Sequence, residues 1–248
     1  MPSTAATAPN RLTVQPPSRL SPDIHSEYVK YQSGTDSVTA YLSYPERPDA
    51  APAVIVIHEN VGLTDFVRTI TEQLAKDGFV AIAPDLLSRR GGTAAAGDSA
   101  RFWIRGLVPD QVTADLDGAA AFVKGLRAVK ADRIGVIGFC WGGAQSFRYA
   151  TNNPSLRAFV VCYGSAPETA DMARIRARGL GVYGENDARI NAGVPAAADA
   201  MKQAGKNYEY AVYPGVGHGF LRSRDNPAVA DSAWRTVVRF FRAELETR

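Results

Sequence analysis

The chain has 248 residues, of which 46% are hydrophobic and 21% charged, and its formal net charge is +3 at pH 7. This length and composition predict one soluble α/β domain with a sizeable core. The small positive charge is spread along the chain, so we expect neither nucleic acid nor an anionic membrane as a partner. The two cysteines exclude a disulfide framework, and no apolar run is long enough to span a membrane.

The first 26 residues are rich in Pro, Ser and Thr and poor in large apolar side chains. We expect an extended or disordered N-terminal arm over residues 1–26, followed by a single domain over residues 27–248. The arm lacks the apolar core of a signal peptide, so we expect a cytoplasmic protein. Removal of a signal peptide before residue 1 would instead indicate a periplasmic or secreted protein.

Strands and helices alternate from Tyr28 onward. The stretches YVKYQ and SVTAYLSYP flank Gly34 and predict an antiparallel hairpin. Beyond them, short apolar runs predict buried strands, and segments with helical spacing predict helices. The predicted strands are 53–57, 79–84, 133–139, 158–164, 180–184 and 208–214. The predicted helices are 65–77, 112–126, 142–150, 195–204 and 229–244.

This alternation predicts a mostly parallel, twisted sheet with helices on both faces and an N-terminal antiparallel hairpin. Ligands bind such sheets at the carboxyl ends of the strands. A catalytic site should therefore be built from polar residues that directly follow strands.

Cys140 follows such a strand, within GFCWGG. The glycine spacing is that of a nucleophile elbow between a strand and a helix, with cysteine in the place of serine. Amides at the start of the helix would favour a thiolate or a developing oxyanion. A free cysteine also packs well in a buried turn, so the motif alone favours a nucleophile without excluding a packing role.

A thiol nucleophile needs a base and an acid that orients it. His218 follows the last predicted strand, whereas His25 lies in the polar arm. Of the two acids after the preceding strand, Glu185 and Asp187, we favour Asp187 because of its reach. The order Cys140, Asp187, His218 is the nucleophile, acid, base order of α/β-hydrolases. Alone, His218 would be interpreted as a surface residue.

Glu59 directly follows the buried strand AVIVI, in the loop that donates an oxyanion-hole amide in such folds. A carboxylate at this edge is costly unless it is partnered, so it has either a catalytic role or a structural salt bridge. The three histidines are scattered and form no metal-ligand set, and we expect neither a metal nor another cofactor.

These features together resemble the dienelactone hydrolase family, α/β-hydrolases with a cysteine nucleophile that open enol-lactone rings in chloroaromatic degradation. The resemblance extends from about Tyr28 to Arg242 and rests on HEN, PDLLSR, GFCWGG, CYG, GENDARI and GHGF. It implies that Cys140 attacks, that His218 is the base and that Asp187 orients it. It also implies that Glu59 pairs with the thiol and helps to deprotonate it when substrate arrives.

The resemblance further implies that Arg89 and Arg222 bind a substrate carboxylate, although either would otherwise be interpreted as a surface residue. The backbone amides of Asn60 and Trp141 would form the oxyanion hole.

Tyr163 matches a pocket tyrosine of the family, and the neighbouring Cys162 is expected in the core. Trp103 lies in the long segment 88–111, which we interpret as a lid or pocket wall, with ordinary packing as the alternative.

The sequence therefore predicts a hydrolase of lactone or ester bonds in a small, carboxylate-bearing substrate. It would act through a Cys-His-Asp triad and an acyl-enzyme, as a monomer or weak homodimer. The alternatives are a general carboxylesterase or thioesterase on simple acyl substrates, and a catalytically silent small-molecule binder.

Overall fold

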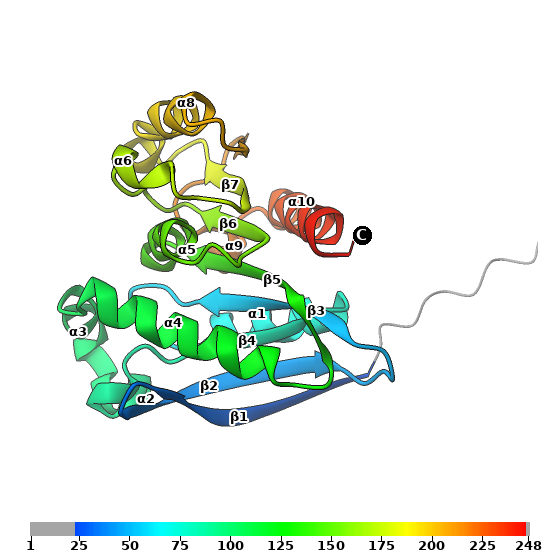
Figure 1. Cartoon of the computed structure of the whole chain (residues 1–248). Coiled ribbons are helices and arrows are strands. Elements are labelled where there is room, and N and C mark those ends of the chain that lie inside the picture. The colour runs from blue at the N-terminus through cyan, green and yellow to red at the C-terminus, as the bar shows by residue number, and fades with distance from the viewer. Residues whose placement is uncertain (1–22, 247–248) are drawn as a thin grey trace, which may run out of the picture.

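One eight-stranded sheet runs through the molecule in the order β1-β2-β4-β3-β5-β6-β7-β8 (Figure 1). The computed structural model describes residues 23–246. The strands are β1 (Ile24–Ser33), β2 (Asp36–Pro45), β3 (Ala51–Ile57), β4 (Val80–Pro84), β5 (Val129–Phe139), β6 (Ala158–Cys162), β7 (Arg178–Gly184) and β8 (Tyr208–Tyr213). Pairs from β4 to β8 are parallel, whereas β1–β2 and β2–β4 are antiparallel. The predicted hairpin and mostly parallel sheet are confirmed.

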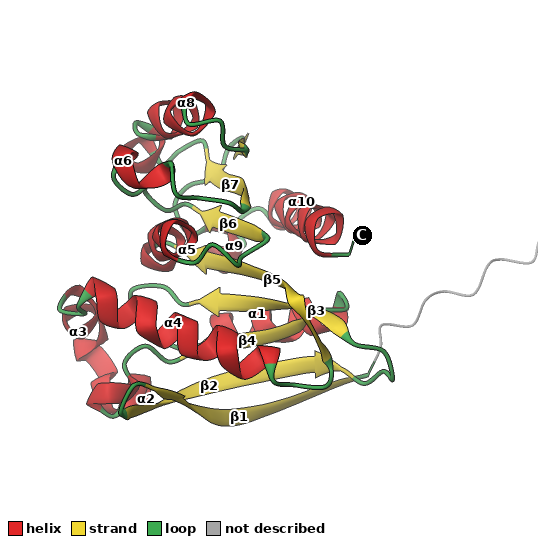
Figure 2. Cartoon of the chain, viewed as in Figure 1, coloured by secondary structure: helices red, strands yellow, loops and turns green. Residues whose placement is uncertain are grey.

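Helices cover both faces of this sheet (Figure 2). They are α1 (Asp65–Lys76), α2 (Gly92–Ala96), α3 (Ala100–Arg105), α4 (Pro109–Lys124), α5 (Trp141–Asn152), α6 (Thr169–Met172), α7 (Ala188–Asn191), α8 (Val194–Gln203), α9 (Phe220–Ser223) and α10 (Pro227–Leu245). Two large apolar clusters form most of the core. Ile55 of β3 packs into the cluster of α4, α5 and α8, and its neighbours Val54 and Val56 pack into that of α1 and α10. Successive side chains of β3 point to opposite faces of the sheet, and both faces are buried, so every residue of β3 is apolar.

The carboxyl ends of β3 and β5 lie side by side at the centre of the sheet. From β3 the chain passes through α1 to β4 on one side, and from β5 it passes through α5 to β6 on the other. Open α/β sheets bind ligands at such a reversal of strand order. The loops after β3 and β5 are therefore where the fold places a site.

The structure adds three short helices to the prediction, α6, α7 and α9, and it differs at two longer segments. Residues 1–22 of the predicted arm lie outside the described residues, and β1 begins at Ile24, inside that arm. Ser26 pairs with Ser43 of β2, with 2.8 Å between the hydroxyl oxygens, so the hairpin continues there. The segment 88–111 holds α2 and α3, which have five and six residues and are too short for a helical period to show.

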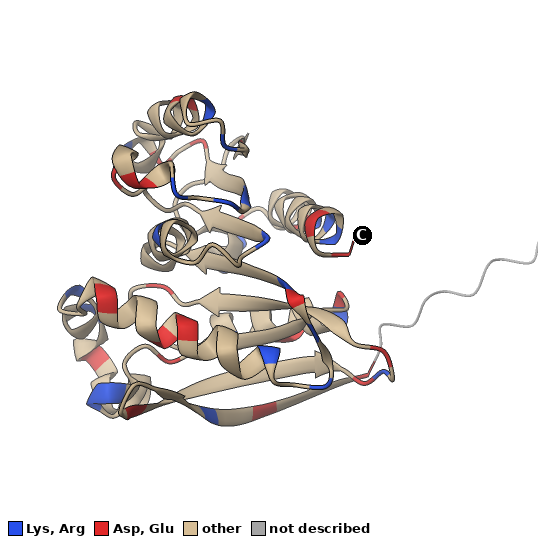
Figure 3. Ribbon diagram, in the orientation of Figure 1, with Lys and Arg blue, Asp and Glu red and all other residues tan. Residues whose placement is uncertain are grey.

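Basic and acidic residues are interspersed along the helices and loops of the ribbon in Figure 3. Within residues 23–246, no helix has the length and apolar character needed to cross a membrane. In the same part of the chain, no three His, Cys, Asp or Glu side chains gather as a metal-ligand set.

Candidate active site

Cys140 joins β5 to α5 with φ 56° and ψ −116°, a conformation that few side chains adopt. The flanking glycines make the turn possible. A Cβ on Gly138 would lie 1.8 Å from the carbonyl oxygen of Gly142, and a Cβ on Gly142 would lie 2.3 Å from that of His58. The Cys140 residue is partly exposed. Strained backbone around an accessible thiol is the geometry of a nucleophile elbow.

His218 lies in the loop between β8 and α9, and Asp187 follows β7. Nδ1 of His218 and Oδ2 of Asp187 are 2.5 Å apart, and the carboxylate is buried. A hydrogen bond with Cys140 is the largest effect that raises the pKa of His218 to about 9; Asp187 adds to it, and burial opposes it. The imidazole therefore interacts with both an acid and a thiol, so the structure brings the three predicted triad residues together.

Glu59 follows β3, and its side chain is 4% exposed. Its Oε2 accepts a hydrogen bond from Nε of Arg222 at 2.9 Å. Burial raises the pKa of the Glu59 carboxyl, whereas Arg222 and His218 lower it. The partner of Glu59 is thus Arg222 rather than the predicted thiol of Cys140. A guanidinium offsets the desolvation of a carboxylate better than a neutral thiol does.

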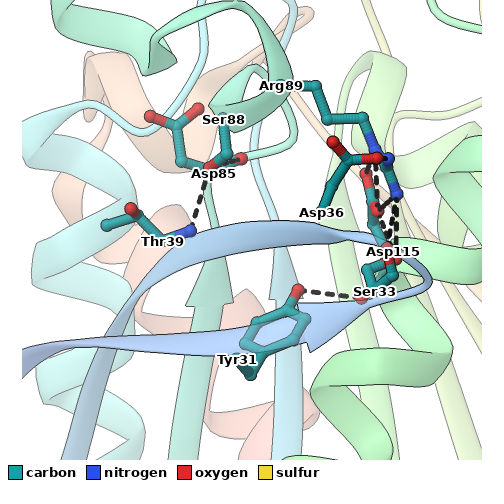
Figure 4. A network of polar contacts seen from close by, with 8 residues as sticks. All are labelled: Tyr31, Ser33, Asp36, Thr39, Asp85, Ser88, Arg89 and Asp115. Carbon is teal, nitrogen blue, oxygen red and sulfur yellow. Dashed lines mark hydrogen bonds and ion pairs between the residues drawn. The ribbon is translucent and has the colours of Figure 1, made fainter.

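Arg89 lies in a different group of polar residues (Figure 4). Its Nη2 donates to Oδ1 of Asp115 at 2.7 Å and to Oγ of Ser33 at 3.0 Å, and its Nη1 pairs with Asp36. Ser33 and Asp36 flank the β1–β2 turn, while Asp115 lies buried on α4. The structure therefore does not bring Arg89 to the triad. Its guanidinium joins the hairpin to α4 instead.

Asn60 and Trp141 lie at the carboxyl ends of the adjacent strands β3 and β5. Trp141 is the first residue of α5, where an amide has no acceptor within the helix. Within residues 23–246, the Asn60 amide has no hydrogen-bond acceptor. In this part of the chain neither amide thus has an acceptor of its own, and their role as an oxyanion hole stays a prediction.

Tyr163 packs against the imidazole of His218, with the rings edge to face and their centroids 5.1 Å apart. It follows β6 with φ 43° and is fully buried. Burial raises the pKa of its phenol, which therefore stays protonated. Its hydroxyl has no hydrogen-bond partner among the described residues. Tyr163 thus packs against one side of the His218 ring and has no surface exposed to a pocket.

Trp103 packs with Trp141 against a small apolar cluster that includes Leu87 and Ile104. The segment around it is also tied down at Thr93 of α2. The Thr93 amide and hydroxyl donate to the carboxylate of Asp85, at 2.6 and 2.9 Å. Trp103 therefore lies beside the start of α5, and two hydrogen bonds join α2 to Asp85.

A cleft of about 940 Å³ adjoins the Glu59–Arg222 pair. Arg222 lines it together with residues of the β1–β2 hairpin, the start of α1 and the 88–94 segment. Cys140 and His218 are not part of its lining, and Arg222 is the lining residue that pairs with Glu59. A ligand bound in the cleft would therefore contact the Arg222 guanidinium.

His58 has no predicted role, yet it lies at the centre of the site. It is fully buried, and both of its ring nitrogens are hydrogen-bonded. The Leu86 amide donates to Nε2 at 3.3 Å, and Nδ1 donates to the Glu59 carbonyl oxygen at 2.7 Å. Its ring stacks on that of Trp141, with centroids 5.7 Å apart and planes at 20°. The one sign of a role for His58 in the sequence is its position directly after a buried strand and before Glu59.

The model of the dienelactone hydrolase family matches residues 38–245. A Methylorubrum extorquens protein, provisionally named a carboxymethylenebutenolidase, is 37% identical over 154 residues, which cover 54% of this chain and 52% of that protein. A Bradyrhizobium protein, provisionally named a 2-oxo-3-(5-oxofuran-2-ylidene)propanoate lactonase, is 31% identical over 150 residues, or 54% of this chain and 60% of that one. The match thus spans about half the length of these relatives.

A crystal structure from Klebsiella pneumoniae, provisionally named a dienelactone hydrolase, superimposes with a TM-score of 0.81 at 29% identity. It covers 88% of this chain and 98% of its own. An acylaminoacyl peptidase of Pyrococcus horikoshii, 15% identical with a TM-score of 0.73 over 90% of this chain and 42% of its own, shares the fold alone. The predicted α/β-hydrolase fold is confirmed.

Proposed function

Because this chain belongs to the dienelactone hydrolase family, we propose that it hydrolyses lactone or ester bonds through an acyl-enzyme on Cys140. One observation carries the proposal: His218 interacts with both the Asp187 carboxylate and the Cys140 thiol. A nucleophile, a base and an orienting acid in this geometry perform acyl transfer on many unrelated folds.

Acylation begins when the Cys140 thiol gives its proton to His218. The thiolate attacks the carbonyl carbon, and the oxyanion that forms accepts hydrogen bonds from the amides of Asn60 and Trp141. The bond to the leaving oxygen then breaks, and that oxygen takes the proton from the imidazolium. The products of this half-reaction are a thioester on Cys140 and an alcohol or enol, which in a lactone stays attached to the acyl group.

Deacylation uses the same base a second time. Water gives a proton to neutral His218 as its oxygen attacks the thioester carbon. The second oxyanion collapses and expels the Cys140 sulphur, which takes the proton back from the imidazolium, and the acid product leaves. Asp187 holds the imidazole in one orientation through both halves.

Arg222 is the arginine that we assign to a substrate carboxylate. It is 55% exposed, it lines the cleft, and it already binds one carboxylate, that of Glu59. A substrate anion would share or take over this guanidinium, which releases Glu59 toward the thiol. The named substrate of the Bradyrhizobium relative carries both a lactone and a propanoate group, which is the combination that this arrangement suits.

Replacement of Cys140 tests the mechanism. We expect C140A to lower hydrolysis of a dienelactone and of p-nitrophenyl acetate by at least about 1,000-fold, with an unchanged melting temperature. Cys162, buried under the site, provides the control, and C162A should keep the activity. A C140A variant as active as the wild type would refute the mechanism.

A second candidate function is a general esterase on uncharged acyl substrates. One observation favours it: Arg89, one of the two arginines predicted to bind a substrate carboxylate, binds Asp115 instead. Of these two arginines, Arg222 alone pairs with a residue of the candidate site, Glu59. The variant R222Q separates the two functions. If the substrate carries a carboxylate, R222Q raises KM for the dienelactone but not for p-nitrophenyl acetate, whereas R224Q changes neither. Equal KM values for the dienelactone in R222Q and the wild type would favour the general esterase.

A further inference from the structure

We propose that His58 is a positioning residue that aims the oxyanion hole. Its imidazole holds the peptide group between Glu59 and Asn60, and thereby sets the direction of the Asn60 amide. The inference rests on the proposed function, since it concerns the oxyanion of that reaction. His58 is fully buried and has no path to a substrate, so its effect must pass through its neighbours.

The two hydrogen bonds of His58 fix its proton. The Leu86 amide can only donate, so Nε2 must accept, at 3.3 Å. Nδ1 must then carry the proton of the neutral ring and donate it to the Glu59 carbonyl oxygen, at 2.7 Å. Burial lowers the pKa of His58 and keeps the ring neutral. One tautomer alone satisfies both neighbours, so the ring has a single orientation.

The planar peptide carries this orientation to the next residue. In a trans peptide the C=O and the following N–H point in opposite directions, and rotation about the C–N bond is costly. A Glu59 carbonyl held against His58 therefore directs the Asn60 N–H away from the imidazole. The other amide that reaches this oxygen within the described chain, that of Gly62, lies at 3.4 Å. The shorter bond from His58 dominates the orientation.

The second amide of the oxyanion hole is tied to the same ring. The indole of Trp141 stacks on the imidazole. Beneath it, the backbone of Gly142 lies against the His58 carbonyl, where a Cβ would approach to 2.3 Å. His58 thus contacts the loop of one predicted donor and the residue of the other. A ring in this place controls the spacing of the two amides, on which oxyanion binding depends.

Two variants separate the two hydrogen bonds. In H58N, the amide nitrogen lies where Nδ1 lies and can still donate to the Glu59 carbonyl. In H58Q, the amide lies near Nε2 and can accept from Leu86 but leaves the Glu59 carbonyl without its donor. Should H58Q fail to fold, H58M carries the same comparison, because its sulphur is an acceptor only. Activity on p-nitrophenyl acetate and melting temperature are measured for each.

We expect H58Q to lower kcat by about 10- to 100-fold with little change in KM, less than the 100- to 1,000-fold that follows removal of an oxyanion-hole donor. H58N should remain within about threefold of the wild type. Iodoacetamide alkylation of Cys140 passes through no oxyanion, so its rate should be unchanged in all variants. Equal losses of kcat in H58N and H58Q would overturn the proposal. So would an unchanged kcat in H58Q, or an alkylation rate that falls with kcat.

The proposal and the function on which it rests fail in different ways. An active C140A variant would remove the acyl-enzyme itself, whatever happens at position 58. An inactive C140A beside a fully active H58Q would leave the mechanism intact and refute only the role of His58.

Discussion

At the residue scale, His218 has to be an acid in one half of the proposed reaction and a base in the other. Its pKa of about 9 is raised first by Cys140 and then by Asp187. The raised pKa favours the imidazolium form of His218 while the free Cys140 sulphur lies beside it. The imidazolium can then protonate the leaving oxygen. Once the sulphur is a thioester, that effect is lost. The pKa then falls, and neutral imidazole becomes available for water at ordinary pH.

The titration of the His218 imidazole should depend on the Cys140 sulphur. In C140A, we expect the pKa of His218 to fall from about 9 toward its ordinary value of 6.5, because its largest raising effect is removed. The Cε1 proton of the ring, followed by NMR across pH 5–10, measures this. C162A is the matched control and should leave the titration in place. The same midpoint in C140A and wild type would show that Asp187 alone sets the pKa.

At the scale of elements, Arg89 shows how one side chain can fasten a hairpin to a helix. The β1–β2 turn reaches α4 through it, and Tyr31 adds a hydrogen bond from its hydroxyl to the Asp115 carbonyl at 2.8 Å (Figure 4). Asp115 is buried, and its carboxylate accepts hydrogen bonds from this guanidinium and from the Ser33 hydroxyl. The hairpin is thereby fixed beside the cleft that it lines.

We therefore expect R89A to act on stability rather than on catalysis. Loss of the guanidinium leaves a buried carboxylate short of its charged partner, which costs about 3 kcal/mol of unfolding free energy. The pair with Asp36 is half exposed, so D36N should cost less than about 1 kcal/mol. Urea denaturation measures both, beside kcat/KM on the dienelactone. If R89A were as stable as the wild type and had a raised KM, Arg89 would be a substrate-binding residue after all.

At the scale of the whole molecule, the long elements could be predicted because their apolar periods span five residues or more. The site could be predicted in part, since Cys140, Asp187 and His218 each follow a strand. The partners of Arg89 could not, because Asp36 and Asp115 lie 53 and 26 positions away along the chain. The motif around Arg89 resembles that of the family, yet in this fold the Arg89 side chain contacts the β1–β2 hairpin. His58 stayed hidden for a similar reason, as its role depends on a backbone carbonyl.

Global stability should also respond to the burial of Glu59. Its folded pKa is raised above its ordinary value of 4.5, chiefly by burial. A raised pKa contributes stability that is present below pH 4.5 and is lost as pH rises through the folded value. E59Q removes this loss, so its unfolding free energy should change less between pH 4.5 and 7 than that of the wild type. Urea denaturation at several pH values tests it, with the exposed E209Q as control. Parallel curves for E59Q and wild type would contradict it.

Four side chains of the candidate site follow β3, β5, β7 and β8: Glu59, Cys140, Asp187 and His218. No short stretch of the chain carries a working set. During refolding, turnover can therefore return only after the last parallel pair, β7–β8, has docked and delivered His218 to the sulphur. Pairing of distant strands is slow compared with helix formation. The rate at which hydrolysis returns would then measure the final assembly of the sheet, whereas circular dichroism would measure the earlier formation of the helices.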